Sequence, residues 1–96
     1  MLIQQKQVGH KGLFYVEENG KRPAELIYTI SGSDLMIIEH TEVADELRGK
    51  NVGYQLVNAA VEYARANNIK ILPLCPFANA VFKKKSAEFG DVLKSN

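Results

Sequence analysis

The sequence has no tryptophan, a single cysteine and only three prolines, and it contains no long uninterrupted apolar run. One cysteine, Cys75, cannot form an intramolecular disulfide or supply a cysteine-based metal site alone, which excludes disulfide-rich secreted scaffolds and suits a reducing cytoplasm. The most apolar stretch, ILPLCPFANAVF, is interrupted by Pro73, Pro76 and Asn79, and the amino terminus lacks the apolar segment of a signal peptide. We therefore expect a cytoplasmic protein with no membrane attachment.

The chain also lacks a strong net charge. Twelve Lys and Arg residues stand against 11 Asp and Glu residues, so the formal net charge is +1 over 96 residues. Such a balance produces no long-range field that attracts a polyanion, and we expect no nucleic-acid partner. His10 and His40 are far apart in the sequence, and no metal site is predicted. The length and the 46% apolar content are typical of one globular domain spanning residues 1–96.

Turn signals divide the first half of the chain into four strand-like segments. Asn19-Gly20 is a strong hairpin signal because both central residues of a type I′ turn need a positive φ. In the segment that follows it, Ala24, Leu26, Tyr28 and Ile30 alternate with more polar residues, as in a strand with one covered face. With residues 2–8 and 34–43, this pattern predicts four consecutive antiparallel strands.

The period changes in the second half. Apolar residues recur at helical spacing from Val52 to Asn68, and a short apolar strand follows at Ile69–Leu74. Because a strand, a helix and a strand form a βαβ unit, the two strands should be parallel. Pro76 suits the first turn of a second helix that ends near Lys85. The predicted fold class is α/β (α+β), a mostly antiparallel mixed sheet of about five strands with a long helix after the fourth strand and a second helix after the fifth.

The loop ADELRGKNVG, residues 44–53, joins the fourth strand to the long helix. A helix N-terminus attracts anions through its uncapped N–H groups and its positive dipole end, and glycine lets a phosphate approach the backbone. The nearest charges are Arg48 and Lys50, since no carboxylate follows Asn51 before Glu62. The spacing matches neither a Walker loop nor a dinucleotide fingerprint. The alternative to an anion-binding loop is a purely structural role, with Gly49 in a turn and Asn51 as an ordinary N-cap.

From this loop on, the order of elements resembles the Gcn5-related N-acetyltransferases. Their pyrophosphate loop, Gln/Arg-x-x-Gly-x-Gly/Ala, is similar to Arg48 through Gly53, with Asn51 in place of the central glycine. The chain most resembles the small, single-domain YjdJ-like subgroup of that family. The three motifs that carry this resemblance are His40-Thr41-Glu42-Val43, Asn51-Val52-Gly53-Tyr54-Gln55-Leu56-Val57 and Cys75-Pro76-Phe77.

The resemblance implies acetyl-coenzyme A (acetyl-CoA) as cosubstrate. In that fold the fourth and fifth strands splay apart, the pantetheine arm lies between them, and the thioester would point toward Cys75. The residues that this implies for binding the cosubstrate are Thr41, Val43, Arg48, Gly49, Lys50, Asn51, Val52, Gly53 and Tyr54.

The candidate catalytic residues are Cys75, His40 and Glu42. In a regular strand His40 and Glu42 share a face with Met36 and Ile38, and Cys75 would lie at the same carboxyl edge of the sheet. An imidazole can activate a thiol, and a carboxylate can orient the imidazole or act as a base. Cys75 could protonate the departing coenzyme A thiolate, or it could accept the acetyl group itself. The alternative is that Cys75 has no catalytic role and is a small buried apolar residue of the core. A bulge near residues 41–43 would change the face of the sheet on which each of these side chains lies.

The leading hypothesis is an acetyl-CoA-dependent acyltransferase, an N-acetyltransferase with an unidentified amine acceptor. Only residues 9–12 join the first two strands, where larger relatives insert helices, and such an open side suits an amine on a protein or polymer. One alternative is a non-catalytic module that binds acetyl-CoA or coenzyme A. Another is a small protein-interaction domain that docks Lys83–Lys85 on an acidic partner. These lysines usually form a solvated helix face, although one of them could meet the 3′-phosphate of coenzyme A.

Overall fold

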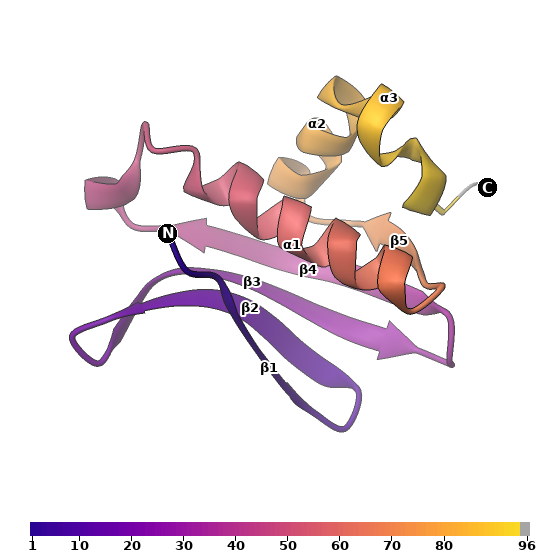
Figure 1. Ribbon diagram of the computed structural model, residues 1–96, viewed down its shortest axis with the longest axis horizontal. Helices are drawn as coiled ribbons and strands as arrows, with labels where there is room; N and C mark the ends of the chain where they lie inside the picture. The colour runs from indigo at the N-terminus through magenta and orange to yellow at the C-terminus, as the bar shows by residue number, and fades with distance from the viewer. Residues whose placement is uncertain (95–96) are drawn as a thin grey trace.

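Five strands form one sheet in the order β1-β2-β3-β4-β5, as seen in the computed structural model, which describes residues 1–94 (Figure 1). The strands β1 to β4 are antiparallel neighbours, and β5 is parallel to β4. The mixed, mostly antiparallel sheet predicted from the sequence is therefore confirmed. The elements are β1 (Gln4–Val8), β2 (Lys11–Glu18), β3 (Lys21–Ser31), β4 (Leu35–Val43), α1 (Val52–Ala66), β5 (Lys70–Pro73), α2 (Pro76–Lys84) and α3 (Ser86–Phe89), with single 3₁₀ turns at Asp45–Leu47 and Gly90–Val92.

The helices gather on one side of the sheet (Figure 1). The alternation predicted for β3 places Leu26 and Tyr28 under α1, where both are fully buried with Met36 and Ile38 of β4. The amphipathic stripe of α1 covers this face, and burial of its apolar side chains stabilises the fold. No helix within residues 1–94 is long and apolar enough to span a membrane.

The hairpin turn between β2 and β3 forms as its sequence indicates. Asn19 and Gly20 both have positive φ angles, 53° and 77°. A type I′ turn requires this geometry, and its twist matches that of the two strands it joins. His10 lies in the turn between β1 and β2.

A bulge in β4 changes the faces predicted for its second half. Tyr28 of β3 pairs with Ile38, but the next residue, Ile27, pairs with His40, so Glu39 is an extra residue in β4. Side chains alternate between faces along a strand, and one extra residue reverses the alternation beyond it. The expectation that His40 and Glu42 share a face with Met36 and Ile38 is therefore wrong.

The bulge also determines what faces α1. Thr41 and Val43 pair with the buried residues Leu26 and Ala24 of β3, so they lie on the helix-covered face. His40 and Glu42 lie on the opposite, uncovered face. The sequence allowed for a bulge at residues 41–43, and it occurs slightly earlier.

The two parallel strands separate next to the bulge. Pairing between β4 and β5 ends at Ile38 and Pro73. Beyond that point β4 continues to Val43, whereas the chain after β5 turns away into α2. The last residues of β4 therefore have no β5 partner, and an opening forms at the carboxyl edge of the sheet.

Candidate functional site

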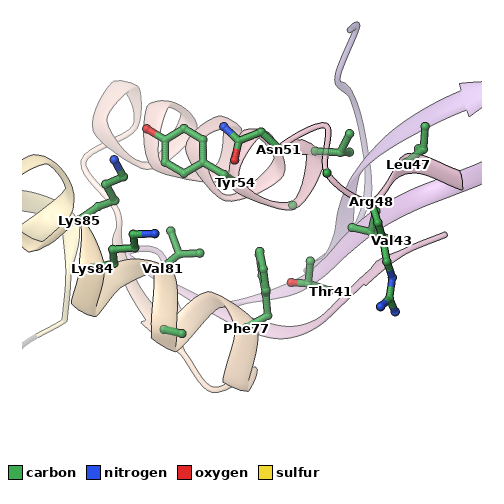
Figure 2. Close-up of a pocket in the computed structure, with 14 residues that line it drawn as sticks. Thr41, Val43, Leu47, Arg48, Asn51, Tyr54, Phe77, Val81, Lys84 and Lys85 are labelled. Carbon is green, nitrogen blue, oxygen red and sulfur yellow. The ribbon is translucent and has the colours of Figure 1, made fainter. Parts of the chain in front are cut away.

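A cavity of about 1000 Å³ lies between the N-terminal turns of α1, the helix α2 and the end of β4 (Figure 2). It is the opening that the separation of β4 and β5 creates, bounded on the far side by the loop after β4. The residues that line it are Thr41, Val43, Leu47, Arg48, Gly49, Asn51, Val52, Gly53, Tyr54, Phe77, Ala80, Val81, Lys84 and Lys85.

The backbone of the loop before α1 lets a ligand approach the N-terminus of this helix closely. Gly49 and Asn51 adopt left-handed conformations with φ of 80° and 63°. Asparagine tolerates this region better than most other non-glycine residues, so Asn51 can take the place of a glycine in the motif. Its side chain does not cap the helix, and within residues 1–94 no acidic residue stands in the first turn of α1. The first N–H groups of α1 therefore remain available to an anion.

The charges on the cavity wall all have one sign. Arg48, Lys84 and Lys85 are the only basic side chains on the wall among residues 1–94, and no carboxylate lines it. Asp45 pairs with Arg48 from outside the cavity, at 3.0 Å between Nε and Oδ1. A chain with nearly balanced charge thus presents a locally cationic cavity, which favours an anionic ligand.

Phe77 of α2 faces the first turn of α1 across the cavity (Figure 2). A Cβ atom added to Gly53 would lie 2.5 Å from Cζ of the Phe77 ring, closer than van der Waals contact allows. The ring remains 43% exposed. Gly53 therefore lets the aromatic ring lie directly on the helix backbone, next to the uncapped N–H groups.

Cys75 lies just behind the cavity wall. Its thiol donates a hydrogen bond to the hydroxyl oxygen of Thr41 at 3.5 Å, and the side chain is 4% exposed. Burial raises the pKa of the Cys75 thiol, but hydrogen bonds that the Thr41 hydroxyl and the backbone of Ala78, Phe77 and Thr41 make to the thiolate outweigh burial and lower the pKa. The thiolate of Cys75 is thus easier to form than that of an ordinary cysteine, at a position next to the cavity.

His40 and Glu42 form a pair of their own. His40 Nε2 lies 3.7 Å from Oε2 of Glu42, and the two side chains are 57% and 69% exposed. Because the bulge turns them to the uncovered face, they share the edge of the sheet with Cys75 but not its face. The imidazole predicted beside the thiol is therefore replaced there by the Thr41 hydroxyl.

The structure gathers eight of the nine residues predicted to bind the cosubstrate around one cavity and leaves Lys50 off its wall. From α2, sequence reasoning considered only a lysine of the run Lys83–Lys85 for the cosubstrate and missed the rest of the helix. The residues of α2 on the wall recur at helical spacing, so the sequence already indicated that they share one face of the helix. Only the packing of α2 beside α1 shows that this face lines a cavity. The lining residues outside the predicted binding set are Leu47, Phe77, Ala80, Val81, Lys84 and Lys85, of which the two lysines belong to the run considered for the 3′-phosphate of coenzyme A.

Residues 13–92 match the family model of the GCN5-related N-acetyl-transferases. A GCN5-like protein from Staphylococcus aureus, solved by NMR, is 36% identical, with 97% of this chain and 89% of that chain covered and a TM-score of 0.74. Tetrahymena Gcn5 is 19% identical over 79% of this chain and 50% of its own, with a TM-score of 0.65.

A GNAT family acetyltransferase from Elizabethkingia anophelis, crystallised with acetyl-CoA bound, is 14% identical over 80% of this chain and 53% of its own, with a TM-score of 0.61. The chain thus spans about half the length of these last two structures, which share its fold. No curated protein matches the sequence.

Proposed function

The chain belongs to the GCN5-related N-acetyltransferase family, and from this premise we propose that it transfers the acetyl group of acetyl-CoA to an amine. The observation that supports this most directly is the cationic cavity. It joins the uncapped N-terminus of α1 to the gap between β4 and β5, and its wall carries no carboxylate within residues 1–94. Acetyl-CoA has phosphates for the cationic wall and an elongated arm for the gap.

The loop would hold the diphosphate of the cosubstrate. Arg48 can donate charge-assisted hydrogen bonds, and the first residues of α1, whose N–H groups have no cap, line the same cavity. Gly49 has no neighbouring atom within 4 Å of the place where a Cβ would stand, so a phosphate can approach the backbone there, whereas the Phe77 ring occupies that space at Gly53. The pantetheine arm would follow the wall from the loop toward Thr41, next to the unpaired edge of β4.

The thioester would then lie near Cys75 and Thr41. In direct transfer the amine nitrogen forms a bond to the acetyl carbon, the carbon–sulfur bond breaks, the amine loses a proton and the coenzyme A sulfur gains one. The Cys75 thiol is a candidate donor of that last proton. In a two-step route the Cys75 thiolate, made more accessible by its lowered pKa, bonds to the acetyl carbon and the coenzyme A thiolate leaves. The amine nitrogen then bonds to the same carbon, the bond to the Cys75 sulfur breaks, and the amine proton passes to the released thiolate.

His40 and Glu42 can act from the other face. Both side chains are exposed at the carboxyl edge of the sheet, so we propose that an amine approaches from the uncovered face while acetyl-CoA occupies the cavity. Glu42, or His40 through its contact with Glu42, would take the proton from the attacking amine. An acceptor on a protein or polymer suits this open face, which no helix within residues 1–94 covers.

A second candidate function is binding of acetyl-CoA without transfer. One observation favours it: among the described residues, no carboxylate or imidazole lines the cavity, so no base adjoins the cosubstrate on that side. Turnover separates the two functions, because a binding module releases no coenzyme A when amines are added.

The test is intact-protein mass spectrometry after incubation with acetyl-CoA, with Cys75→Ser treated in parallel. An acetyl adduct that hydroxylamine removes and that the variant lacks supports the two-step route. No adduct, together with amine-dependent release of coenzyme A, supports direct transfer. If acetyl-CoA neither modifies the protein nor raises its unfolding temperature, the proposed function is wrong.

A further inference from the structure

Two lysines of α2 form a separate cationic end of the cavity. Lys84 and Lys85 both line it. Figure 2 shows them at the end away from Thr41, Val43 and Arg48, beside Tyr54 of α1. The phosphate-binding loop therefore does not need them for the diphosphate, and they are available to a second anionic group of the same ligand.

The two lysines differ in how they are held. Lys84 is exposed and has no ion-pair partner among residues 1–94. Lys85 is half-buried, with Nζ 5.4 Å from the centre of the Tyr54 ring and 3.8 Å from Oε1 of Glu88. Tyr54 is itself stacked on Phe89, with ring centres 5.9 Å apart. The ammonium group of Lys85 is thus held by the Tyr54 ring and by Glu88, whereas that of its neighbour Lys84 can follow a ligand.

Helix stability alone does not account for this arrangement. Cations in the last turn of a helix interact favourably with its dipole, and Lys83 and Lys84 both occupy the last turn of α2. Lys83, however, does not line the cavity. The helix dipole would be served by any of the three lysines, whereas only Lys84 and Lys85 are directed to the cavity.

We propose that Lys84 and Lys85 form the subsite for the 3′-phosphate of coenzyme A. The inference rests on the proposed function, because it assigns one end of the ligand that the function requires. Coenzyme A carries its diphosphate and its 3′-phosphate as two separate anionic groups, and the cavity has two separate cationic ends. A phosphate monoester has a charge of about −1.5 to −2 at neutral pH, so two ammonium groups can neutralise it.

The test compares coenzyme A with 3′-dephospho-coenzyme A, which differ only in that phosphate. We expect calorimetry to give a dissociation constant at least about tenfold lower for coenzyme A, a preference that corresponds to about 1.4 kcal/mol. The double variant Lys84→Gln/Lys85→Gln should lose most of this preference while its affinity for 3′-dephospho-coenzyme A stays within about twofold of the wild type. Salt at about 1 M should also narrow the preference, because it screens exposed charges.

Lys83→Gln is the matched control, since it removes the same charge from the same helix without changing the cavity wall. It should keep the wild-type preference, and thermal unfolding of each variant shows that it is folded. Equal affinity of the wild type for the two ligands overturns the subsite while leaving the proposed function intact. An equal loss of preference in Lys83→Gln also overturns it, because the effect would then be one of net charge. No binding of either ligand overturns the proposed function and the subsite with it.

Discussion

The thiol of Cys75 and the hydroxyl of Thr41 lie 3.5 Å apart although 34 residues separate them in the sequence. The contact joins the end of β5 to the end of β4 at the point where these parallel strands separate. Thr41 lines the cavity, and Cys75 lies behind it at the N-terminus of α2. The pair therefore couples the chemistry of the thiol to whatever occupies the cavity.

Replacement of Thr41 by valine should raise the pKa of the Cys75 thiol, because the variant keeps the shape of the side chain and removes a hydrogen bond that lowers the pKa. The absorbance of the thiolate followed against pH measures this. Thr41→Ser retains the hydroxyl and should leave the pKa close to that of the wild type. Equal titration curves for the valine variant and the wild type would contradict this assignment.

The same pKa makes stability depend on pH. Since the folded-state pKa of Cys75 lies below the unfolded value, the unfolded chain binds more protons between the two values. The free energy of unfolding should therefore rise with pH through that window and be fully gained above the unfolded pKa. Urea unfolding at a series of pH values should show this rise in the wild type and not in Cys75→Ser.

Gly53 and Phe77 should be energetically coupled. Alanine at position 53 gains helix propensity of about 1 kcal/mol, but its Cβ would displace the Phe77 ring, and overpacking costs about 1–3 kcal/mol. We expect Gly53→Ala to be neutral or destabilising in the wild type and stabilising in a Phe77→Ala background. Urea denaturation of the four proteins gives the coupling energy. A change in stability that is the same in both backgrounds would show that the ring does not oppose the added methyl group.

Asn51 should tolerate glycine better than alanine. Its φ of 63° costs a residue with a Cβ about 1–2 kcal/mol, and its side chain makes no capping hydrogen bond that glycine would lose. We expect Asn51→Gly to keep wild-type stability within about 0.5 kcal/mol and Asn51→Ala to lose about 1 kcal/mol. If chemical denaturation gives the alanine and glycine variants the same free energy of unfolding, the left-handed conformation is not the reason for asparagine at this position.

Arg48 and Lys50 should differ in their effect on coenzyme A binding although both were predicted to contact it. Arg48 lines the cavity and Lys50 does not. Arg48→Ala should weaken binding about tenfold through loss of charge-assisted hydrogen bonds, and Lys50→Ala by less than about twofold. Calorimetry at one fixed salt concentration makes the comparison. Equal losses for the two variants would indicate that only the net charge of the loop matters.

Glu42→Gln should separate binding from transfer. The side chain lies on the uncovered face, away from the cavity, so the dissociation constant for coenzyme A should stay within about twofold of the wild type. Turnover with an accepted amine should fall by about 10²-fold or more if the carboxylate takes the amine proton. Turnover that matches the wild type would remove Glu42 from the mechanism while leaving the cavity assignment unaffected.

Local sequence predicted the elements of the fold and most of the cavity. The Asn19-Gly20 turn, the alternation in β3, the amphipathic stripe of α1 and the proline at the start of α2 each act over a few residues, and all appear in the structure. The predicted bounds of α1 and β5 differ from the observed ones by one or two residues at some ends, which is the usual ambiguity of helix and strand termini.

Long-range packing decided how those elements combine into a site. Glu39 becomes an extra residue only because the pairing of β4 with β3 shifts there, and this shift sends His40 and Glu42 to one face and Thr41 to the other. Lys84 and Lys85 face a cavity only because α2 packs beside α1. The sequence by itself determined the turns, the periodicities and the glycine-containing loop before α1, since these depend on neighbouring residues. Strand register and the packing of one helix beside another depend on contacts between distant segments, so only the tertiary structure decided them.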